Sequence, residues 1–421
     1  MSRATDTVLK GLEEIRPWVE DLYKDLHTHP ELGRQEHRTA AKAAEALRTD
    51  GYEVTEGIGG TGLIGVLRRG EGPTVMLRAD MDALPVAEAT GLPYASTVTV
   101  PSDDGTPVPV MHACGHDVHV ASMLGFARLM ARAREAWHGT LVVLFQPDEE
   151  GGTGADAMVA DGLVDRSPRP DVVLAQHVLP YPAGYVGTRA GSFLTAADST
   201  RAILYGRGAH GSMPQHAIDP VVMAAMAVVR LQTVVSRELA PATPAVVTVG
   251  SITAGTGPNI IPDRAELKIN VRTYDEETRA TVRAAVERVV RAEAAASGAE
   301  REPEFEALAA FPPTVNDEAP TRTVAAAFDE LFGDQAHTIE PQTASEDMSR
   351  IPAAFGVPFT YWGIGGTDPA VYEKAAAAGR LTSDVPVNHS PHFAPVPQPT
   401  LDTGVSALTA AALAWLAAPE D

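Results

Sequence analysis

The chain has 421 residues, and 55 Asp and Glu against 33 Lys and Arg give it a formal net charge of −22. Nucleic acids and anionic membranes both need a basic protein surface, so this charge argues against either as a partner. A content of 44% hydrophobic and 21% charged residues is typical of a soluble globular protein. The chain is longer than a domain built around a single hydrophobic core usually is, so two domains are expected.

No cationic leader followed by an apolar run opens the chain, and no uninterrupted apolar stretch reaches spanning length. We therefore expect a cytoplasmic protein. The single cysteine, Cys114, cannot form an intrachain disulfide, and a free thiol suits a reducing compartment.

The first third of the chain alternates helix and strand patterns. Apolar residues at helical spacing predict one amphipathic helix over residues 6–28, and a second helix over about 37–50 would end at Gly51, which suits a left-handed cap. Nearly continuous apolar runs predict central strands covered on both faces, with a crossover helix over 118–134 among them. These strands are expected at 62–67, 74–78, 141–145 and 172–175.

The middle of the chain has the order β-α-β-β-α-β, which is that of the split βαβ unit. Its strands are expected at 199–205, 245–252, 265–272 and 304–309, and its helices at 220–237 and about 275–297. The chain then resumes with a helix at 321–332, a strand at 357–362 and a final helix at 400–417. Between these last two elements, the Gly- and Pro-rich segment 363–399 is expected to be the longest irregular stretch, and such loops are usually functional.

These patterns predict an α/β protein in which a mixed sheet with helices on both faces forms one domain. A ferredoxin-like (βαββαβ) module would be inserted into it. The expected boundaries are 1–191 and 309–421 for the discontinuous first domain and 192–308 for the insert.

One short segment places Cys114 between His112, His116 and His119, with Asp117 beside them. A thiolate and imidazoles packed this densely are the ligands that a borderline-soft divalent metal prefers. A lone cysteine is often only a small buried hydrophobe, but the flanking histidines favour half of a metal site.

Other polar side chains follow the expected strands, where ligands bind in open α/β sheets. Glu149 and Glu150 are adjacent, so one carboxylate can ligate a metal while the other takes a proton from a water molecule. The alternative for this pair is a solvated acidic turn at the start of a helix. Asp80 and Asp82 share one strand face; they would orient ligand histidines or be ordinary polar groups at a strand end.

Together these segments resemble the aminoacylase, hippurate hydrolase and auxin-conjugate hydrolase branch of the dinuclear-metal metallopeptidases. The matching segments run in family order from about residue 20 to 400. They are His29-Pro30-Glu31, Arg78 to Pro85, His112 to Asp117, Gln146-Pro147 with Glu149 to Gly152, His210 to Pro214, Val247 to Gly250, Asn259 to Pro262, Ser345 to Asp347 and His389 to Phe393. Taken jointly, the pattern is specific.

The resemblance implies that two divalent ions, zinc or else manganese or cobalt, bind each subunit. The implied ligands are Cys114, His116, Glu150, His177 and His389. It also implies that Glu149 is the general base and that the inserted module serves as lid and dimerisation domain. His392, three residues after His389, is a rival ligand. Asp148 stands where the family more often has a small neutral residue, and it would bring a third carboxylate near the metals.

The resemblance further implies that His210 reaches the partner subunit's active site in a homodimer and stabilises the oxyanion. Asn259 and Arg272 match positions that would bind a substrate carboxylate, although Arg272 could equally be a solvated strand residue. Residues 220–237 would supply much of the dimer contact.

The expected function is metal-dependent hydrolysis of the amide bond of an N-acyl amino acid, a small-molecule substrate. The first alternative is a dipeptidase or carboxypeptidase on the same fold, and the shape of the pocket formed by residues 363–388 would distinguish them. The second is a catalytically silent metal-binding protein, whose sequence would lack Glu149 or a metal ligand; none is missing.

Overall fold

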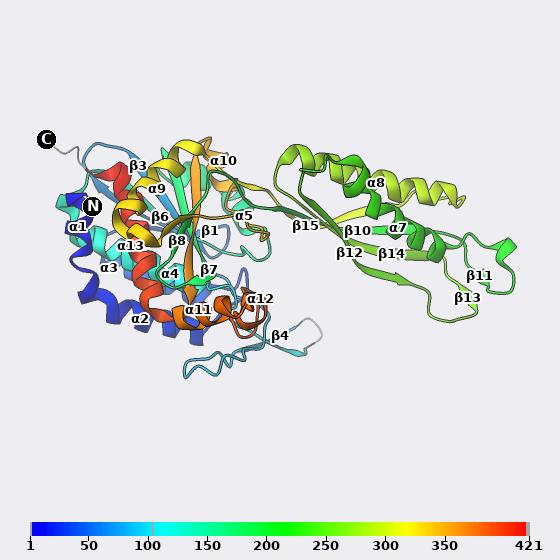
Figure 1. The fold of residues 1–421 in the computed structure, drawn as a ribbon, viewed down its shortest axis with the longest axis horizontal. Coiled ribbons are helices and arrows are strands. Elements are labelled where there is room, and N and C mark those ends of the chain that lie inside the picture. The colour runs from blue at the N-terminus through cyan, green and yellow to red at the C-terminus, as the bar shows by residue number, and fades with distance from the viewer. Residues whose placement is uncertain (1, 103–104, 418–421) are drawn as a thin grey trace. The chain divides into compact units, whose positions relative to one another are not determined.

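The structure is a computed structural model that describes residues 2–102 and 105–417 (Figure 1). It divides into two compact units. Unit 1 holds the residues up to Gly191, Asn316–Glu340 and the residues from Asp347 onward, whereas unit 2 holds Ser192–Val315 and Pro341–Glu346. The return to unit 1 thus falls after Val315 rather than at residue 309, because β15 (Glu304–Phe311) pairs with β10 (Ala196–Tyr205) of unit 2.

Unit 1 is built on an eight-stranded mixed sheet in the order β1-β2-β6-β3-β7-β18-β8-β17. The four central strands β6, β3, β7 and β18 run parallel, and their carboxyl ends therefore meet at one edge of the sheet. The strands are β1 (Glu53–Ile58), β2 (Gly62–Arg69), β3 (Thr74–Asp80), β6 (Gly139–Gln146), β7 (Val172–Pro182), β8 (Val186–Thr188), β17 (Ala336–Thr338) and β18 (Phe359–Thr367).

Both faces of this sheet are buried, as the continuous apolar runs predict. Leu77 and Val143 face the core cluster that includes α4 and α13, while their strand neighbours Met76 and Val142 are equally inaccessible to solvent. The helices of unit 1 are α1 (Arg3–Leu9), α2 (Leu12–Thr28), α3 (His37–Thr49), α4 (His116–Arg132), α5 (Gly154–Ala160), α6 (Leu163–Arg166), α9 (Glu318–Phe332), α10 (Arg350–Phe355), α11 (Pro369–Ala377), α12 (Leu381–Asp384) and α13 (Pro397–Leu416). The predicted α/β class is confirmed.

Unit 2 contains a four-stranded antiparallel sheet in the order β12-β14-β10-β15, with two helices packed on it (Figure 1). Its elements follow one another as β10, α7 (Pro220–Glu238), β12 (Ala245–Ala254), β14 (Arg264–Thr273), α8 (Glu276–Ala296) and β15. This is the βαββαβ order that the sequence predicts. Alternate residues of β14, such as Leu267 and Ile269, lie in the core beneath α7 and α8.

Helix α7 is the one helix among the described residues that is long and apolar enough to cross a membrane by length and composition alone. One stripe of it, including Met223, Ala227 and Leu231, is fully buried in the core of unit 2. A buried core helix passes the same test of length and composition.

Two predictions about the elements are wrong. The helix expected over residues 6–28 is two helices, α1 and α2, that break at Lys10 and Gly11. The segment 363–399 is not irregular throughout, because β18 continues to Thr367 and α11 and α12 follow. Asp368 caps α11 by accepting the backbone N–H groups of Ala370 and Val371, and Pro369 supplies a helix-compatible first residue.

Candidate active site

The five predicted metal ligands of unit 1 come from four places on the fold. Cys114 and His116 lie at the start of α4, Glu150 follows β6, His177 lies in β7, and His389 lies in the loop before α13. The strand order brings the ends of β6, β3 and β7 side by side, and α4 begins over this edge. Residues 275 positions apart in the sequence therefore meet.

The turn at Gly115 sets the direction of the first two ligands. Gly115 has φ of +81°, a left-handed conformation that favours glycine, and a Cβ there would collide with Val178. Cys114 thus remains in the loop before α4, while His116 is the first residue of the helix. Both are buried, with Cys114 8% exposed and His116 fully enclosed.

Among the described residues, four groups of side chains have ligand atoms that all lie within 4.8 Å of one another, and two of these groups contain Glu150. One group is Cys114, Glu150 and His389, in which Nε2 of His389 lies 3.3 Å from Oε1 of Glu150. The other is His116, Glu149 and Glu150, in which Nε2 of His116 is 3.9 Å from Oε2 of Glu149. Glu150 belongs to both of these groups, so its carboxylate links the ligands on the two sides.

His177 joins the site through its free ring nitrogen. Its Nδ1 lies 2.8 Å from the carbonyl oxygen of Val178, which can only accept, so Nδ1 must carry the proton. Nε2 therefore presents a lone pair, and it lies 3.5 Å from Sγ of Cys114. Burial lowers the pKa of His177 well below its usual value, which keeps the ring neutral, as a metal ligand must be.

His119 lies beside this cluster but has no free lone pair. Its Nε2 accepts the backbone N–H of Val178 at 2.9 Å, so its Nδ1 carries a proton and donates it to Asp80 at 2.5 Å. The buried Arg78 donates to the same carboxylate at 2.6 Å. Asp80 therefore orients His119, which in turn fixes the backbone next to His177. Oδ2 of Asp80 also lies 3.8 Å from Nε2 of the predicted ligand His116.

Asp82 does contact a predicted ligand. Its Oδ1 lies 3.2 Å from Nδ1 of His116, and its Oδ2 accepts the backbone N–H of Glu150 at 2.9 Å. With Nδ1 of His116 donating to this carboxylate, Nε2 is left to face the cluster. Asp82 thereby contacts two predicted ligands, His116 and Glu150, at the same time.

The donor set fits divalent metal ions. Nε2 of His116 is buried, makes no hydrogen bond, and lies 4.0 Å from Oε1 of Glu150. Buried polar atoms normally have partners, so an unpartnered nitrogen at the centre of a cluster of potential ligands points to a cation-binding site. Burial alone would raise the pKa of Glu150, but the imidazoles of His389 and His116 outweigh it and lower the pKa. One thiolate, three imidazoles and carboxylates match zinc well.

His389, rather than His392, reaches the cluster. The Nδ1 of His392 donates to the carbonyl of Ala89 at 2.9 Å, away from the other predicted ligands. His389 has φ of +70°, an uncommon value for a residue other than glycine, and its side chain is 56% exposed.

Asn388, just before His389, is a site residue that was not predicted from the sequence. The amide of Asn388 donates to the carbonyls of Cys114 and Val178, at 3.2 Å each. It therefore joins the loop of His389 to the two segments that carry Cys114 and His177. Its position next to a predicted ligand was the available signal.

Asp148 does not bring a third carboxylate to the cluster, contrary to the expectation. Its side chain turns instead to Arg34, whose Nε donates at 3.0 Å, and to the hydroxyl of Thr153. In the described residues, it belongs to none of the groups close enough to hold an ion.

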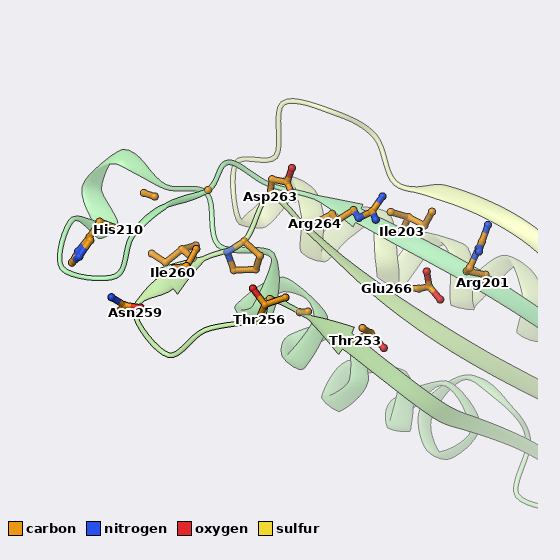
Figure 2. Close-up of a pocket in the computed structure, with 16 residues that line it drawn as sticks. Arg201, Ile203, His210, Thr253, Thr256, Asn259, Ile260, Asp263, Arg264 and Glu266 are labelled. Atoms are coloured by element: carbon orange, nitrogen blue, oxygen red, sulfur yellow. The ribbon is translucent and has the colours of Figure 1, made fainter.

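Unit 2 carries the predicted His210 and Asn259. They line one pocket of about 980 Å³ at the end of the sheet, where β11 (Ala209–His210) pairs with β13 (Ile260–Ile261). Figure 2 shows both residues at one end of this pocket, with Arg201 and Glu266 towards the other. Nδ1 of His210 accepts the backbone N–H of Ser212 at 3.1 Å, so Nε2 carries the proton and can donate it to an anion.

Arg272 lies far from that pocket within unit 2. It sits near the last residue of β14, whereas Arg264, which lines the pocket, is the first residue of the strand. Eight residues of extended chain span roughly 26 Å. The guanidinium of Arg272 donates to the carbonyl of Thr343 at 2.8 Å and to the hydroxyl of Ser345 at 3.1 Å. Asn259 and Arg272 of one chain therefore do not meet on one ligand.

Comparisons with known proteins give the family. Residues 76–378 match the model of peptidase family M20/M25/M40. The chain belongs to this family. It is 38% identical over 341 residues to a hippurate hydrolase of Campylobacter jejuni, an alignment that covers 80% of this chain and 85% of the relative. It is 35% identical over 359 residues to thermostable carboxypeptidase 1 of Saccharolobus solfataricus, with 84% and 87% covered.

A solved M20 structure from Bacillus subtilis, described as a dinuclear metal-binding peptidase, has a TM-score of 0.76 and 28% identity. The match covers 95% of this chain and 98% of that one. The resemblance stated from the sequence motifs is thus confirmed, and with it the assignment of this chain to the hydrolases of amide bonds.

Proposed function

We propose that the protein is a metal-dependent amidohydrolase that cleaves an N-acyl amino acid to a carboxylic acid and a free amino acid. The observation that carries the proposal is the shared Glu150, which joins Cys114 and His389 on one side to His116 on the other. The similarity to a hippurate hydrolase supports an acylated amino acid as the substrate, since hippurate is one.

Cys114, His116, Glu150, His177 and His389 would hold two divalent ions. Zinc suits the thiolate and imidazoles best, and manganese or cobalt would also fit a site that includes carboxylates. When bound, such ions polarise an amide carbonyl and lower the pKa of a water molecule. No other part of the proposal depends on which metal is present.

Glu149 would act as the general base. It is 5% exposed, and its Oε2 lies 3.9 Å from Nε2 of His116 in the same cluster. Its carboxylate would take the proton of the attacking water and deliver it to the leaving amine.

His210 would donate its Nε2–H to the oxyanion that develops at the acyl carbonyl oxygen, and its hydrogen bond with Ser212 leaves that proton available. Arg272 and Asn259 would bind the substrate carboxylate. Because they lie at opposite ends of β14, we propose that they serve different sites, with His210 and Asn259 completing the site of a partner subunit.

The proposed oligomer is a homodimer formed through unit 2. Val222, Met226 and Val229 form an apolar face of α7 that is 54%, 49% and 65% exposed. Their i, i+4, i+7 spacing places them on one side of the helix, opposite the buried stripe. A second copy of this face would cover them.

The single free Cys114 and the charge of −22 support a cytoplasmic enzyme with neither nucleic acid nor membrane as partner.

A carboxypeptidase or dipeptidase is the second candidate, and the similarity to a thermostable carboxypeptidase favours it. The deciding experiment measures amine release from a panel of N-acyl amino acids and dipeptides, with metal-loaded and chelator-treated protein. Metal-dependent cleavage of acylated amino acids over dipeptides is expected. Cleavage of dipeptides alone would show that the protein is a peptidase. No cleavage of any substrate would indicate a catalytically silent metal-binding protein.

A further inference from the structure

The loop that carries Glu149 and Glu150 is joined to a segment near residue 34, more than a hundred positions earlier in the sequence, by contacts that the proposed chemistry does not use. Arg34 donates from Nε to Oδ2 of Asp148 at 3.0 Å and from Nη2 to the hydroxyl of Thr153 at 2.5 Å. That hydroxyl donates its own proton to Asp148. The three side chains form a closed ring of hydrogen bonds around the loop, which we name the Arg34 clasp.

A buried carboxylate anchors both sides of the clasp. Oε1 of Glu36 accepts the backbone N–H of Arg34 at 3.0 Å and the backbone N–H of Asp148 at 2.9 Å. Oε2 accepts the hydroxyl of Thr61 at 2.6 Å, and Glu36 is completely buried. One oxygen atom thus fixes the backbone of the residue immediately before Glu149.

The backbone is strained where the clasp closes. Of the described residues other than glycine, Arg34, Asp148 and His389 have positive φ, at 64°, 49° and 70°. Two of these three contact each other in the clasp, and the third is a predicted metal ligand. Such conformations persist where the surroundings enforce them, and they gather at functional sites.

Two glycines leave the space that the clasp needs. A Cβ on Gly33 or on Gly151 would collide with the carboxylate of Asp148. Both segments are therefore shaped around this side chain. Asp148 is only 9% exposed, although the side chain of its partner Arg34 is 60% exposed.

We propose that the Arg34 clasp is a positioning device for the general base, acting through Asp148 to set the direction of the Glu149 carboxylate. This inference rests on the proposed role of Glu149. An ion pair with an exposed partner contributes little to global stability, so the main effect of the clasp is geometric. Misplacement of a catalytic group by about 1 Å can cost roughly 100-fold in rate.

The test uses Arg34→Ala and Asp148→Gly, the latter because glycine accepts a positive φ while removing the carboxylate. We expect each to lower kcat roughly 10- to 100-fold, with KM and metal content unchanged. The double variant should be no worse than the worse single variant, because both remove the same contact. Arg322→Ala is the matched control, since Arg322 is 70% exposed and pairs with Glu318 away from the site.

A second measurement does not depend on turnover. In metal-free protein, Arg34→Ala should speed amide hydrogen exchange at Asp148 and Gly154, whose N–H groups form hydrogen bonds in the clasp region, while exchange in β3 stays as in the parent.

A conservative variant gives a third comparison. The Asp148→Asn side chain keeps one acceptor oxygen, so this variant should retain more activity than Asp148→Gly.

The outcomes separate the two proposals. If Glu149→Gln is inactive while Arg34→Ala and Asp148→Gly turn over like the parent, the clasp has no positioning role. A loss of kcat that disappears once metal content is equalised would also overturn it. If Glu149→Gln is itself active, the proposed base is wrong and the clasp inference falls with it.

Discussion

Nδ1 of His116 lies 3.2 Å from Oδ1 of Asp82, and the other oxygen of the same carboxylate accepts the backbone N–H of Glu150. One side chain therefore fixes the ring of one predicted ligand and the backbone of another. The consequence is that a residue outside the ligand set controls how well the set fits an ion.

Asp82→Ala should weaken metal binding roughly 10- to 100-fold, because His116 loses the acceptor that orients its ring and Glu150 loses its backbone partner. Competition titration against a chelator of known affinity measures this directly. Asp156→Ala is a suitable control, since that carboxylate is 55% exposed and pairs with Arg350. Equal metal affinity of Asp82→Ala and the parent would show that Asp82 is only a structural residue.

Glu149→Gln should keep both metals and lose activity by roughly 100- to 10,000-fold, because only the proton acceptor is removed. Glu150→Gln should instead release metal, since Glu150 belongs to both ligand groups. Metal analysis and steady-state kinetics of the two variants distinguish these roles. Metal loss from Glu149→Gln with full occupancy in Glu150→Gln would reverse the two assignments.

The sequence predicted most of the sheet because buried parallel strands have continuous apolar runs, as in Leu141 to Phe145. It did not predict β1 (Glu53–Ile58), an edge strand whose exposed residues give no such run. It also missed α11, because Gly365 and Gly366 resemble a loop. In the structure Gly365 belongs to β18, where a Cβ would collide with the carbonyl of Pro182.

The candidate ligands could be named from the sequence because their motifs are local and each side chain has distinctive chemistry. Orientation could not be predicted in the same way. Asp148 is adjacent to Glu149, yet its carboxylate turns to Arg34, a residue 114 positions away. Likewise, the separation of Asn259 from Arg272 follows from the length of β14 and not from either motif.

His210→Ala should retain its metals and lose most turnover, because its oxyanion donor is missing. On the proposed dimer, mixing it with Glu149→Gln should restore activity. Random exchange makes half of the dimers hybrids, and each hybrid has one complete site of two, so recovery of about a quarter of the parent activity is expected. Verified hybrids without recovery would mean that His210 acts in its own subunit or not at all.

A buried histidine outside the predicted ligand set gives a prediction for the pH dependence of stability. His27 lies between two carboxylates, with Nδ1 2.6 Å from Asp117 and Nε2 3.1 Å from Glu88, and all three side chains are buried. Burial lowers the pKa of His27, but these hydrogen bonds outweigh it and raise the pKa to about 10.

The sign of the effect follows from proton binding. Between about pH 6.5 and 10, folded His27 holds a proton that the unfolded chain releases, so the free energy of unfolding falls as pH rises. The stabilisation should be complete below pH 6.5 and absent above pH 10. Glutamine can still donate to a carboxylate but does not titrate, so His27→Gln removes this contribution. The measurement is the free energy of unfolding of both metal-free proteins, obtained by denaturant titration at pH values from 6 to 10. The difference between the two proteins should shrink as pH rises. A difference that stays constant with pH would mean that His27 is neutral in the folded protein.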